Sequence, residues 1–90
     1  MQNDAQVIEI IDRSLVDEFE LDPEKLKPDA RLVEDLGFDS LDFVDLVVVL
    51  QKRFGVNLRE EPRAREVRTL GDVHRLVMTI KRELETSQGV

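Results

Sequence analysis

The stretch DSLDFVDLVVVLQKRFG, residues 39–55, decides the fold of this chain. Asp39 is a natural N-cap, because its carboxylate can accept a hydrogen bond from a backbone N–H of the first helical turn. Gly55 stands where a glycine commonly ends a helix, and the two basic residues shortly before it suit a last turn. The stretch therefore predicts a helix from about Ser40 to Phe54.

A helical wheel gives this predicted helix two apolar faces. The face that we assign to the core carries Phe43, Leu46, Val47, Leu50 and Phe54. The opposite face carries Leu41, Val44, Asp45, Val48 and Lys52. A surface helix usually turns polar residues to solvent, and an apolar stripe bordered by charges marks a contact site. We favour a protein-docking surface here; the alternative is that the loop 21–39 covers the stripe.

Two further stretches repeat apolar residues with helical period. The first is capped by Asn3 or Asp4, with its stripe on Ile8, Ile11, Leu15 and Phe19 and with Val7 and Ile10 beside that stripe. The second runs from about Leu70 to Glu85 after the N-cap Thr69, with its stripe on Val73, Val77, Ile80 and Leu84. Residues 60–67 have room for one or two helical turns with Pro62 near their start, and the last five residues are expected to fray. No segment has a strand signal, so the sequence predicts an all-α fold.

The connection over residues 21–39 contains two prolines and one glycine, yet it is rich in large apolar residues. These are Leu21, Leu26, Leu32, Val33, Leu36 and Phe38. Long structureless connections are uncommon in compact domains and are often functional. We therefore expect this loop to be pinned across the helices, with a single helical turn within residues 29–36.

The length and composition exclude several classes of protein. Ninety residues without cysteine allow one small domain over residues 1–90, with an ordered core at about 4–85 and no disulfide, thiolate metal site or cysteine nucleophile. So short a chain has little room for an enclosed active site, so an enzyme is not expected. The N-terminus lacks a signal-peptide pattern, and the longest apolar run, residues 46–50, cannot span a bilayer. We expect a cytoplasmic monomer with no membrane partner.

The net charge of −7 is unevenly distributed. Residues 1–45 hold 14 acidic and four basic side chains, whereas residues 46–90 hold six acidic and nine basic ones. The overall acidity argues against nucleic acid as a partner and favours a protein with a basic patch. An acidic docking face is therefore expected in the first half of the chain.

Ser40 follows the predicted cap Asp39 and should expose its hydroxyl at a loop–helix junction. A helix N-terminus stabilises anions, so a phosphoryl group is electrostatically favoured there. The sequence has no glycine-rich phosphate cradle, and its single histidine, His74, is 34 positions away and beside a core stripe. A nucleophilic serine needs a neighbouring base. We therefore interpret His74 as structural and Ser40 as a substrate for another enzyme.

Residues 34–47, EDLGFDSLDFVDLV, resemble the prosthetic-group attachment segment of acyl carrier proteins. The resemblance extends over nearly the whole chain, and it implies a four-helix bundle of acyl-carrier type with a long first loop and a short third helix. It also implies that a phosphopantetheinyl transferase attaches 4′-phosphopantetheine to Ser40, between Asp39 and Leu41. The arm would carry acyl groups as thioesters, lodge the acyl chain between helices and present it to acyl-transferring and synthase enzymes.

The same resemblance implies docking residues on the second helix. By position, the apolar contacts would be Leu41, Val44 and Val48, and the acidic contacts Asp39, Asp42 and Asp45; the wheel adds Lys52. The sequence departs from the housekeeping carriers of fatty-acid synthesis at Gln51-Lys52-Arg53 and in the arginine-rich stretch 59–68. We therefore expect a specialised carrier, in polyketide, secondary-metabolite or unusual-lipid synthesis.

Three alternatives remain. In the first, the chain is an unmodified helical interaction module that uses the outer face of the second helix. The acidic residues Glu34, Asp35, Asp39, Asp42 and Asp45 could attract a divalent cation weakly, but they lack the glycine and closing glutamate of an EF-hand, so no dedicated metal site is expected. RNA binding through residues 59–68 is disfavoured, because no aromatic residue is available for stacking there.

Overall fold

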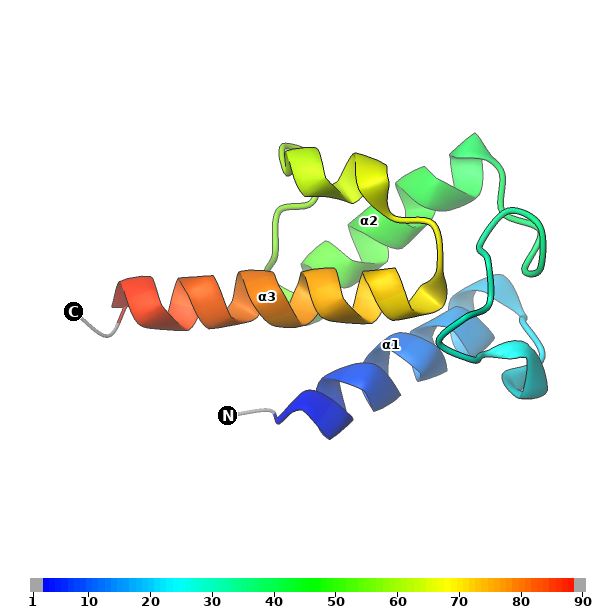
Figure 1. Cartoon of the computed structure of the whole chain (residues 1–90), viewed down its shortest axis with the longest axis horizontal. Helices are drawn as coiled ribbons and strands as arrows, with labels where there is room; N and C mark the ends of the chain where they lie inside the picture. Colours follow the sequence, from blue (N-terminus) through cyan, green and yellow to red (C-terminus); the bar gives the residue numbers. More distant parts are fainter. Residues whose placement is uncertain (1–2, 89–90) are drawn as a thin grey trace.

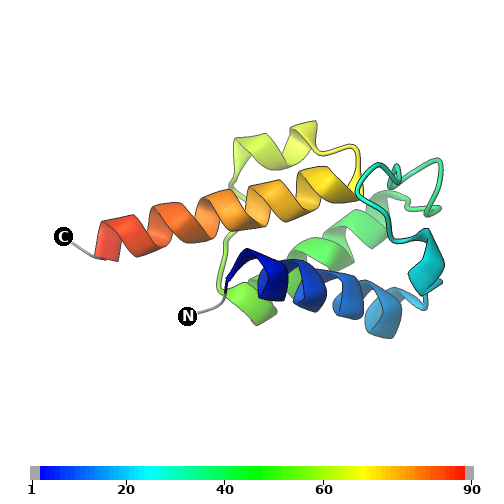
Figure 2. The same ribbon diagram turned by 60° about the horizontal axis from the view of Figure 1, so that its bottom comes forward.

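The computed structural model describes residues 3–88 of the chain. These residues contain three α-helices and two short 3₁₀ helices (Figure 1). In chain order they are α1 (Asp4–Phe19), η1 (Pro23–Lys25), α2 (Ser40–Phe54), η2 (Pro62–Glu66) and α3 (Leu70–Gln88). Helix α1 runs one way along the molecule, and α2 and α3 return the other way (Figures 1 and 2). The described residues contain no strand; their β pairing is limited to one isolated bridge between Arg31 and Thr69.

Helix α2 has the ends that its sequence predicts. The Asp39 carboxylate accepts the Asp42 N–H at 2.9 Å, and the Asp42 carboxylate accepts the Asp39 N–H at 3.1 Å. This reciprocal capping box satisfies two backbone donors at the start of the helix. At the other end Gly55 has a φ of 71°, a conformation that favours glycine, and its N–H donates to the Gln51 carbonyl at 2.8 Å.

Helix α1 begins after Asn3, which forms a similar capping box with Gln6. Its core face is turned slightly from the predicted stripe: Val7 is buried, whereas Ile8 is only half-buried. The cause is Ser14, which is also buried and donates its hydroxyl hydrogen bond to the Ile10 carbonyl at 2.8 Å. A serine satisfied within its own helix can face the interior, so a stripe drawn through apolar residues alone is misplaced.

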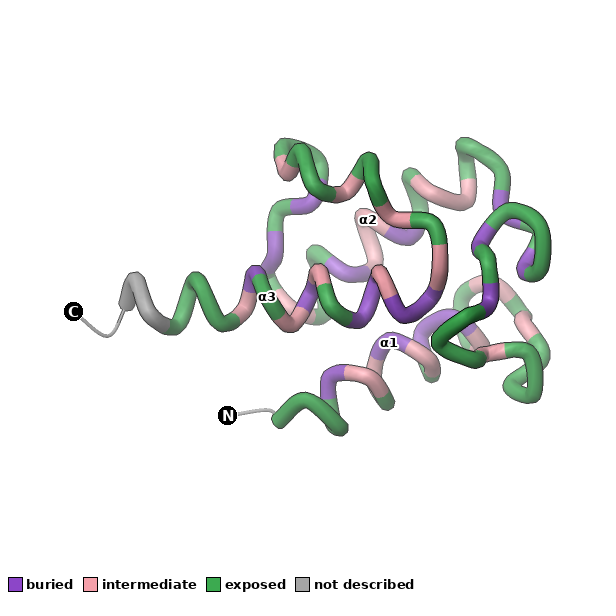
Figure 3. The backbone as a smooth tube through the Cα atoms, viewed as in Figure 1, coloured by how far each residue is buried: buried purple, intermediate pink, exposed green. Residues whose placement is uncertain are grey.

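The loop between α1 and α2 is pinned across the helices, as its apolar content predicts. Its Ala30, Leu32, Leu36 and Phe38 are all buried in the common core (Figure 3). Its backbone also bonds to the start of α3: the Leu70 N–H donates to the Ala30 carbonyl at 2.9 Å. Within the loop, the Asp35 N–H donates to the Arg31 carbonyl at 2.9 Å, which closes the single turn expected over residues 29–36.

The expected short third helix is a 3₁₀ helix, so the predicted count of four helices is not confirmed for the described residues. Pro62 opens η2 and has no N–H, and Val67 already returns to an extended conformation. With buried Leu58 before it and half-buried Val67 after it, the chain has only a few residues in which to turn. A segment this short forms i→i+3 hydrogen bonds more readily than it forms a stable α-helix.

Helix α3 extends to Gln88, beyond the predicted end at Glu85. Its last turns project past the other helices (Figure 1), and Leu84, placed on the core stripe by the sequence, is 42% exposed because no described segment covers it. The backbone of residues 86–88 continues the helix, and the predicted fraying of residues 89–90 falls outside the described residues.

An ion-pair cluster ties η2 to α3. The Arg63 guanidinium lies 2.8 Å from a Glu61 carboxylate oxygen and 2.8 Å from one of Glu83. The hydrogen bonds from the Arg63 side chain and backbone lower the pKa of Glu61 to about 2, and the same guanidinium lowers the pKa of Glu83. Both carboxylates therefore stay ionised at neutral pH and hold η2 beside α3.

Candidate functional site

Ser40 is the first residue of α2 and its side chain is exposed. The junction in front of it is held by Phe38, which is buried two residues earlier. The Phe38 ring packs between the rings of Phe19 and Phe43, with centroid separations of 5.1 and 5.6 Å. Aromatic pairs at such distances add to the stability of a core. The fold therefore presents the Ser40 hydroxyl to solvent from a firmly packed position.

The start of α2 can accept an anion next to Ser40. The carboxylates of Asp39 and Asp42 are already engaged with backbone N–H groups in the capping box. Among residues 3–88, the N–H groups of Ser40 and Leu41 have no hydrogen-bond partner, as expected in the first turn of a helix. Free amides and the positive end of the helix dipole attract a phosphoryl group.

His74 has a structural role, as its position in the sequence predicts. It is buried, at 5% exposure, and its ring lies against Asp12 of α1. The His74 Nε2 atom lies 2.8 Å from the Asp12 Oδ1 atom. This contact joins α3 to α1 and engages the Nε2 atom of the ring.

The outer face of α2 is open to solvent. Leu41 is 73% exposed and Val44 is 51% exposed, whereas Val48 is half-buried. The charged residues Asp45 and Lys52 are exposed on the same face. The loop 21–39 therefore does not cover this stripe, and that alternative is wrong.

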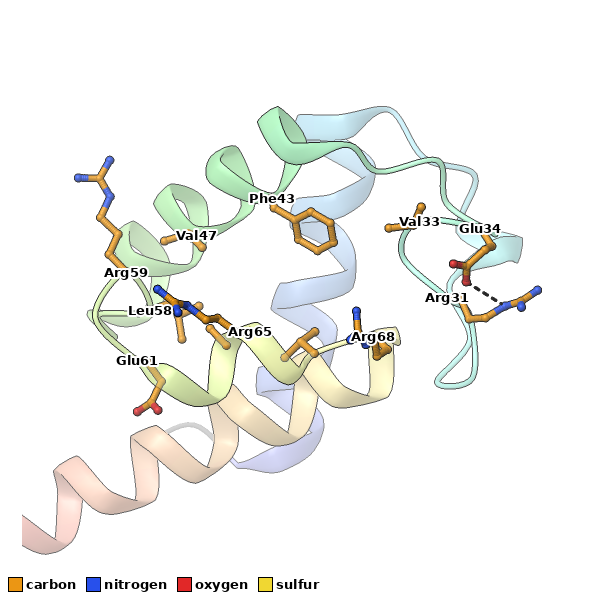
Figure 4. A pocket seen from close by; sticks show the side chains of 12 residues that line it. Arg31, Val33, Glu34, Phe43, Val47, Leu58, Arg59, Glu61, Arg65 and Arg68 are labelled. Atoms are coloured by element: carbon orange, nitrogen blue, oxygen red, sulfur yellow. Dashed lines mark ion pairs between the residues drawn. The ribbon is translucent and has the colours of Figure 1, made fainter.

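A groove of about 640 Å³ lies between α2 and η2 (Figure 4). Phe43 and Val47 point into it from α2, and Leu58 lies on its far wall. Ser40, Phe43 and Val47 are spaced i, i+3 and i+7, so they follow one side of the helix. A chain attached at Ser40 would run along α2 directly into this groove. The sequence assigned Phe43 and Val47 only to the core, and the wall opposite them could not be located without the fold.

Behind the groove lies an apolar void of about 40 Å³. Its lining includes Leu46 and Leu50 of α2 and Val77 of α3. No aromatic side chain other than Phe43 lines it. Aliphatic side chains in such a void can adjust to a guest more readily than rigid rings.

A family model described as the phosphopantetheine attachment site matches residues 9–77. The chain belongs to the acyl carrier protein family. It is 37% identical over 75 residues to the acyl carrier protein of Wolinella succinogenes, which covers 83% of this chain and 97% of the relative. It is 38% identical over 71 residues to the acyl carrier protein of Thermosynechococcus vestitus, covering 79% of this chain and 86% of the relative.

Membership of this carrier family makes 4′-phosphopantetheine the prosthetic group and makes the chain a carrier rather than an enzyme. The residues around Ser40 fit that group. An exposed hydroxyl, two unpartnered backbone N–H groups and an apolar groove along the same side of α2 suit a phosphodiester followed by a long flexible arm.

The structure bears on two further expectations. Within residues 3–88 no three histidine, aspartate or glutamate side chains gather as a metal site. One of the acidic residues proposed as a weak cation site is engaged elsewhere: the Arg31 backbone N–H and guanidinium bind Asp35 and lower the pKa of its carboxyl. No described helix combines the length and apolar content needed to cross a membrane.

Proposed function

We propose that Ser40 is the residue to which 4′-phosphopantetheine is attached, and that the chain carries acyl intermediates of fatty-acid, polyketide or related lipid synthesis. The observation that carries this proposal is the position of Ser40. Its exposed hydroxyl opens α2, at the head of the side of the helix that leads into the groove. The group supplies a terminal thiol that holds the acyl chain as a thioester.

In the attachment step the Ser40 hydroxyl oxygen attacks the β-phosphorus of coenzyme A. The new oxygen–phosphorus bond replaces the bond to 3′,5′-ADP, which leaves, and the hydroxyl proton passes to a base of the phosphopantetheinyl transferase. The free N–H groups of Ser40 and Leu41 stabilise the negative phosphodiester that results. Capping engages Asp39 and Asp42, which reduces the repulsion that their carboxylates would exert on it.

We further propose that partner enzymes dock on the outer face of α2. Leu41 and Val44 offer exposed apolar area beside the attachment residue, and Val48 extends this stripe. Asp39, Asp42 and Asp45 are the acidic contacts, and Lys52 closes the stripe at its far end. A partner with a basic surface around an apolar patch would complement this face.

Intact-mass analysis tests the attachment residue. After incubation with coenzyme A and a phosphopantetheinyl transferase, the chain should gain the mass of one phosphopantetheinyl group. Ser40→Ala should gain nothing. Ser14→Ala is the matched control: it removes a buried hydroxyl whose only partner is a carbonyl of its own helix, so modification should be unchanged. No gain in the unaltered chain, or a gain that persists in Ser40→Ala, would contradict the proposal.

A further inference from the structure

The groove between α2 and η2 has an unusual lining for so acidic a protein. Its floor is apolar, but four arginines and two glutamates border it. These are Arg31, Arg59, Arg65, Arg68, Glu34 and Glu61. The chain as a whole carries 20 acidic and 13 basic residues, so a positively charged groove is an exception to its surface.

Half of these charges are neutralised by neighbours. The Arg31 guanidinium lies 3.4 Å from Glu34 and 3.2 Å from Asp35, and in Figure 4 it points away from the groove. Glu61 lies 2.8 Å from Arg63. These three lining residues therefore have their charges matched within the protein.

The other three lining charges have no such match. Within the described residues, the side chains of Arg59, Arg65 and Arg68 make no ion pair and no side-chain hydrogen bond. All three are exposed. Arg65 and Arg68 rise from the wall opposite Phe43, whereas Arg59, at one end of the groove, points its guanidinium away from it (Figure 4). Each guanidinium offers a planar set of N–H donors that matches a carboxylate.

The apolar floor lies within reach of a chain tethered at Ser40. At 1.5 Å per residue, Phe43 and Val47 lie roughly 5 and 10 Å beyond Ser40 along the helix axis. The groove differs from the small apolar pocket behind it in its size and in its charged rim. An uncharged hydrocarbon chain would contact the floor and leave the Arg65 and Arg68 guanidinium groups without partners.

We propose that this groove binds acyl groups that bear a carboxylate, with the chain on the apolar floor and the carboxylate held by Arg65 and Arg68. The proposal rests on attachment of the prosthetic group at Ser40. It specifies the class of cargo: acyl chains that end in, or carry, an acid group. Arg65 and Arg68 lie on the wall opposite α2, so they can reach a chain that runs along α2.

A pair of six-carbon acyl groups tests this assignment. The chain is loaded from hexanoyl- or adipoyl-coenzyme A by a phosphopantetheinyl transferase, and the two products differ only in a terminal methyl or carboxylate. Hydrolysis of each thioester is compared with that of the same thioester on free pantetheine. The adipoyl group should be protected about threefold to tenfold more than the hexanoyl group, since paired exposed charges contribute about that much. High salt should remove the difference.

The double variant Arg65→Gln/Arg68→Gln should lose the extra protection of the adipoyl group and leave the hexanoyl group unchanged. The matched control, Arg13→Gln/Arg53→Gln, removes the same two charges from exposed arginines that do not line the groove, and it should retain the protection. Thermal melts confirm folding, because the hydrogen bonds that residue 68 makes to Leu32 and Asp72 use its backbone.

The outcomes separate this inference from the proposed function. Equal protection of the two acyl groups, or adipoyl protection that survives in the double variant, would overturn the groove assignment alone. Failure of the unaltered chain to gain mass from either coenzyme A thioester would overturn attachment at Ser40 and the groove assignment with it.

Discussion

Truncating Leu50 to alanine should destabilise the fold far more than truncating Leu41, although both leucines lie on α2. Leu50 is 1% exposed, whereas Leu41 is 73% exposed. The two variants remove the same atoms from the same helix. They therefore isolate the effect of burial from that of helix propensity.

The expected size follows from the packing around each residue. Removing three buried carbons forfeits about 0.8 kcal/mol for each of them, and the cavity left behind adds to that loss. Leu50 borders a small apolar pocket of about 40 Å³, so its truncation would enlarge a gap that is already present. We expect Leu50→Ala to lower the free energy of unfolding by about 3–5 kcal/mol and Tm by at least about 12 °C. Leu41→Ala should change the free energy by no more than about 0.5 kcal/mol.

Urea unfolding followed by circular dichroism measures both values, provided that the denaturant slope is unchanged. The transferase reaction should rank the variants in the opposite order. Leu41→Ala should reduce kcat/KM because the exposed leucine lies on the proposed docking face. Similar losses of stability in the two variants would refute the assignment of the two faces of α2. A loss below about 1 kcal/mol for Leu50→Ala would refute the packing described here.

Three further predictions concern charge and backbone packing. Asp45→Lys should weaken the transferase reaction about tenfold at low salt with little change in Tm, because the carboxylate is exposed on the docking face. Arg63→Gln should reduce stability above pH 4.5 and converge with the unaltered chain as the pH falls to about 2, because the lowered pKa of Glu61 confines its stabilising contribution to the ionised form. Gly71→Ala should destabilise by about 1–3 kcal/mol, because its Cβ would lie 2.9 Å from the Pro28 carbonyl oxygen.

Each of these predictions has a control or an outcome that would contradict it. Glu85→Lys reverses an exposed charge away from the docking face, so an equal loss of transferase activity would point to net charge instead of docking. If the η2 cluster does not contribute to stability, urea unfolding across the acidic range should give Arg63→Gln and the unaltered chain the same free energy of unfolding at every pH. A Gly71→Ala chain with unchanged Tm would show that the loop can retreat from α3.

Local chemistry was sufficient to predict α2 and the place of Ser40 at its start. A cap side chain acts on N–H groups within three residues, and a C-terminal glycine acts through its own φ. The loop was also predicted to be pinned, because so many apolar residues cannot all remain in water. The 3₁₀ form of η2 was not predicted, because it depends on where Leu58 and Val67 must both reach the core.

The sequence by itself determined the three long helices, the capped start of α2 and the attachment segment around Ser40, since all of these depend on residues that are near neighbours in the chain. The tertiary structure alone decided that Ser14 and His74 are buried and that Leu84 is exposed. It also placed the arginines of residues 59–68 across a groove from α2. Burial and groove formation depend on which distant segments pack together, and a helical period specifies a face of a helix without specifying what covers it.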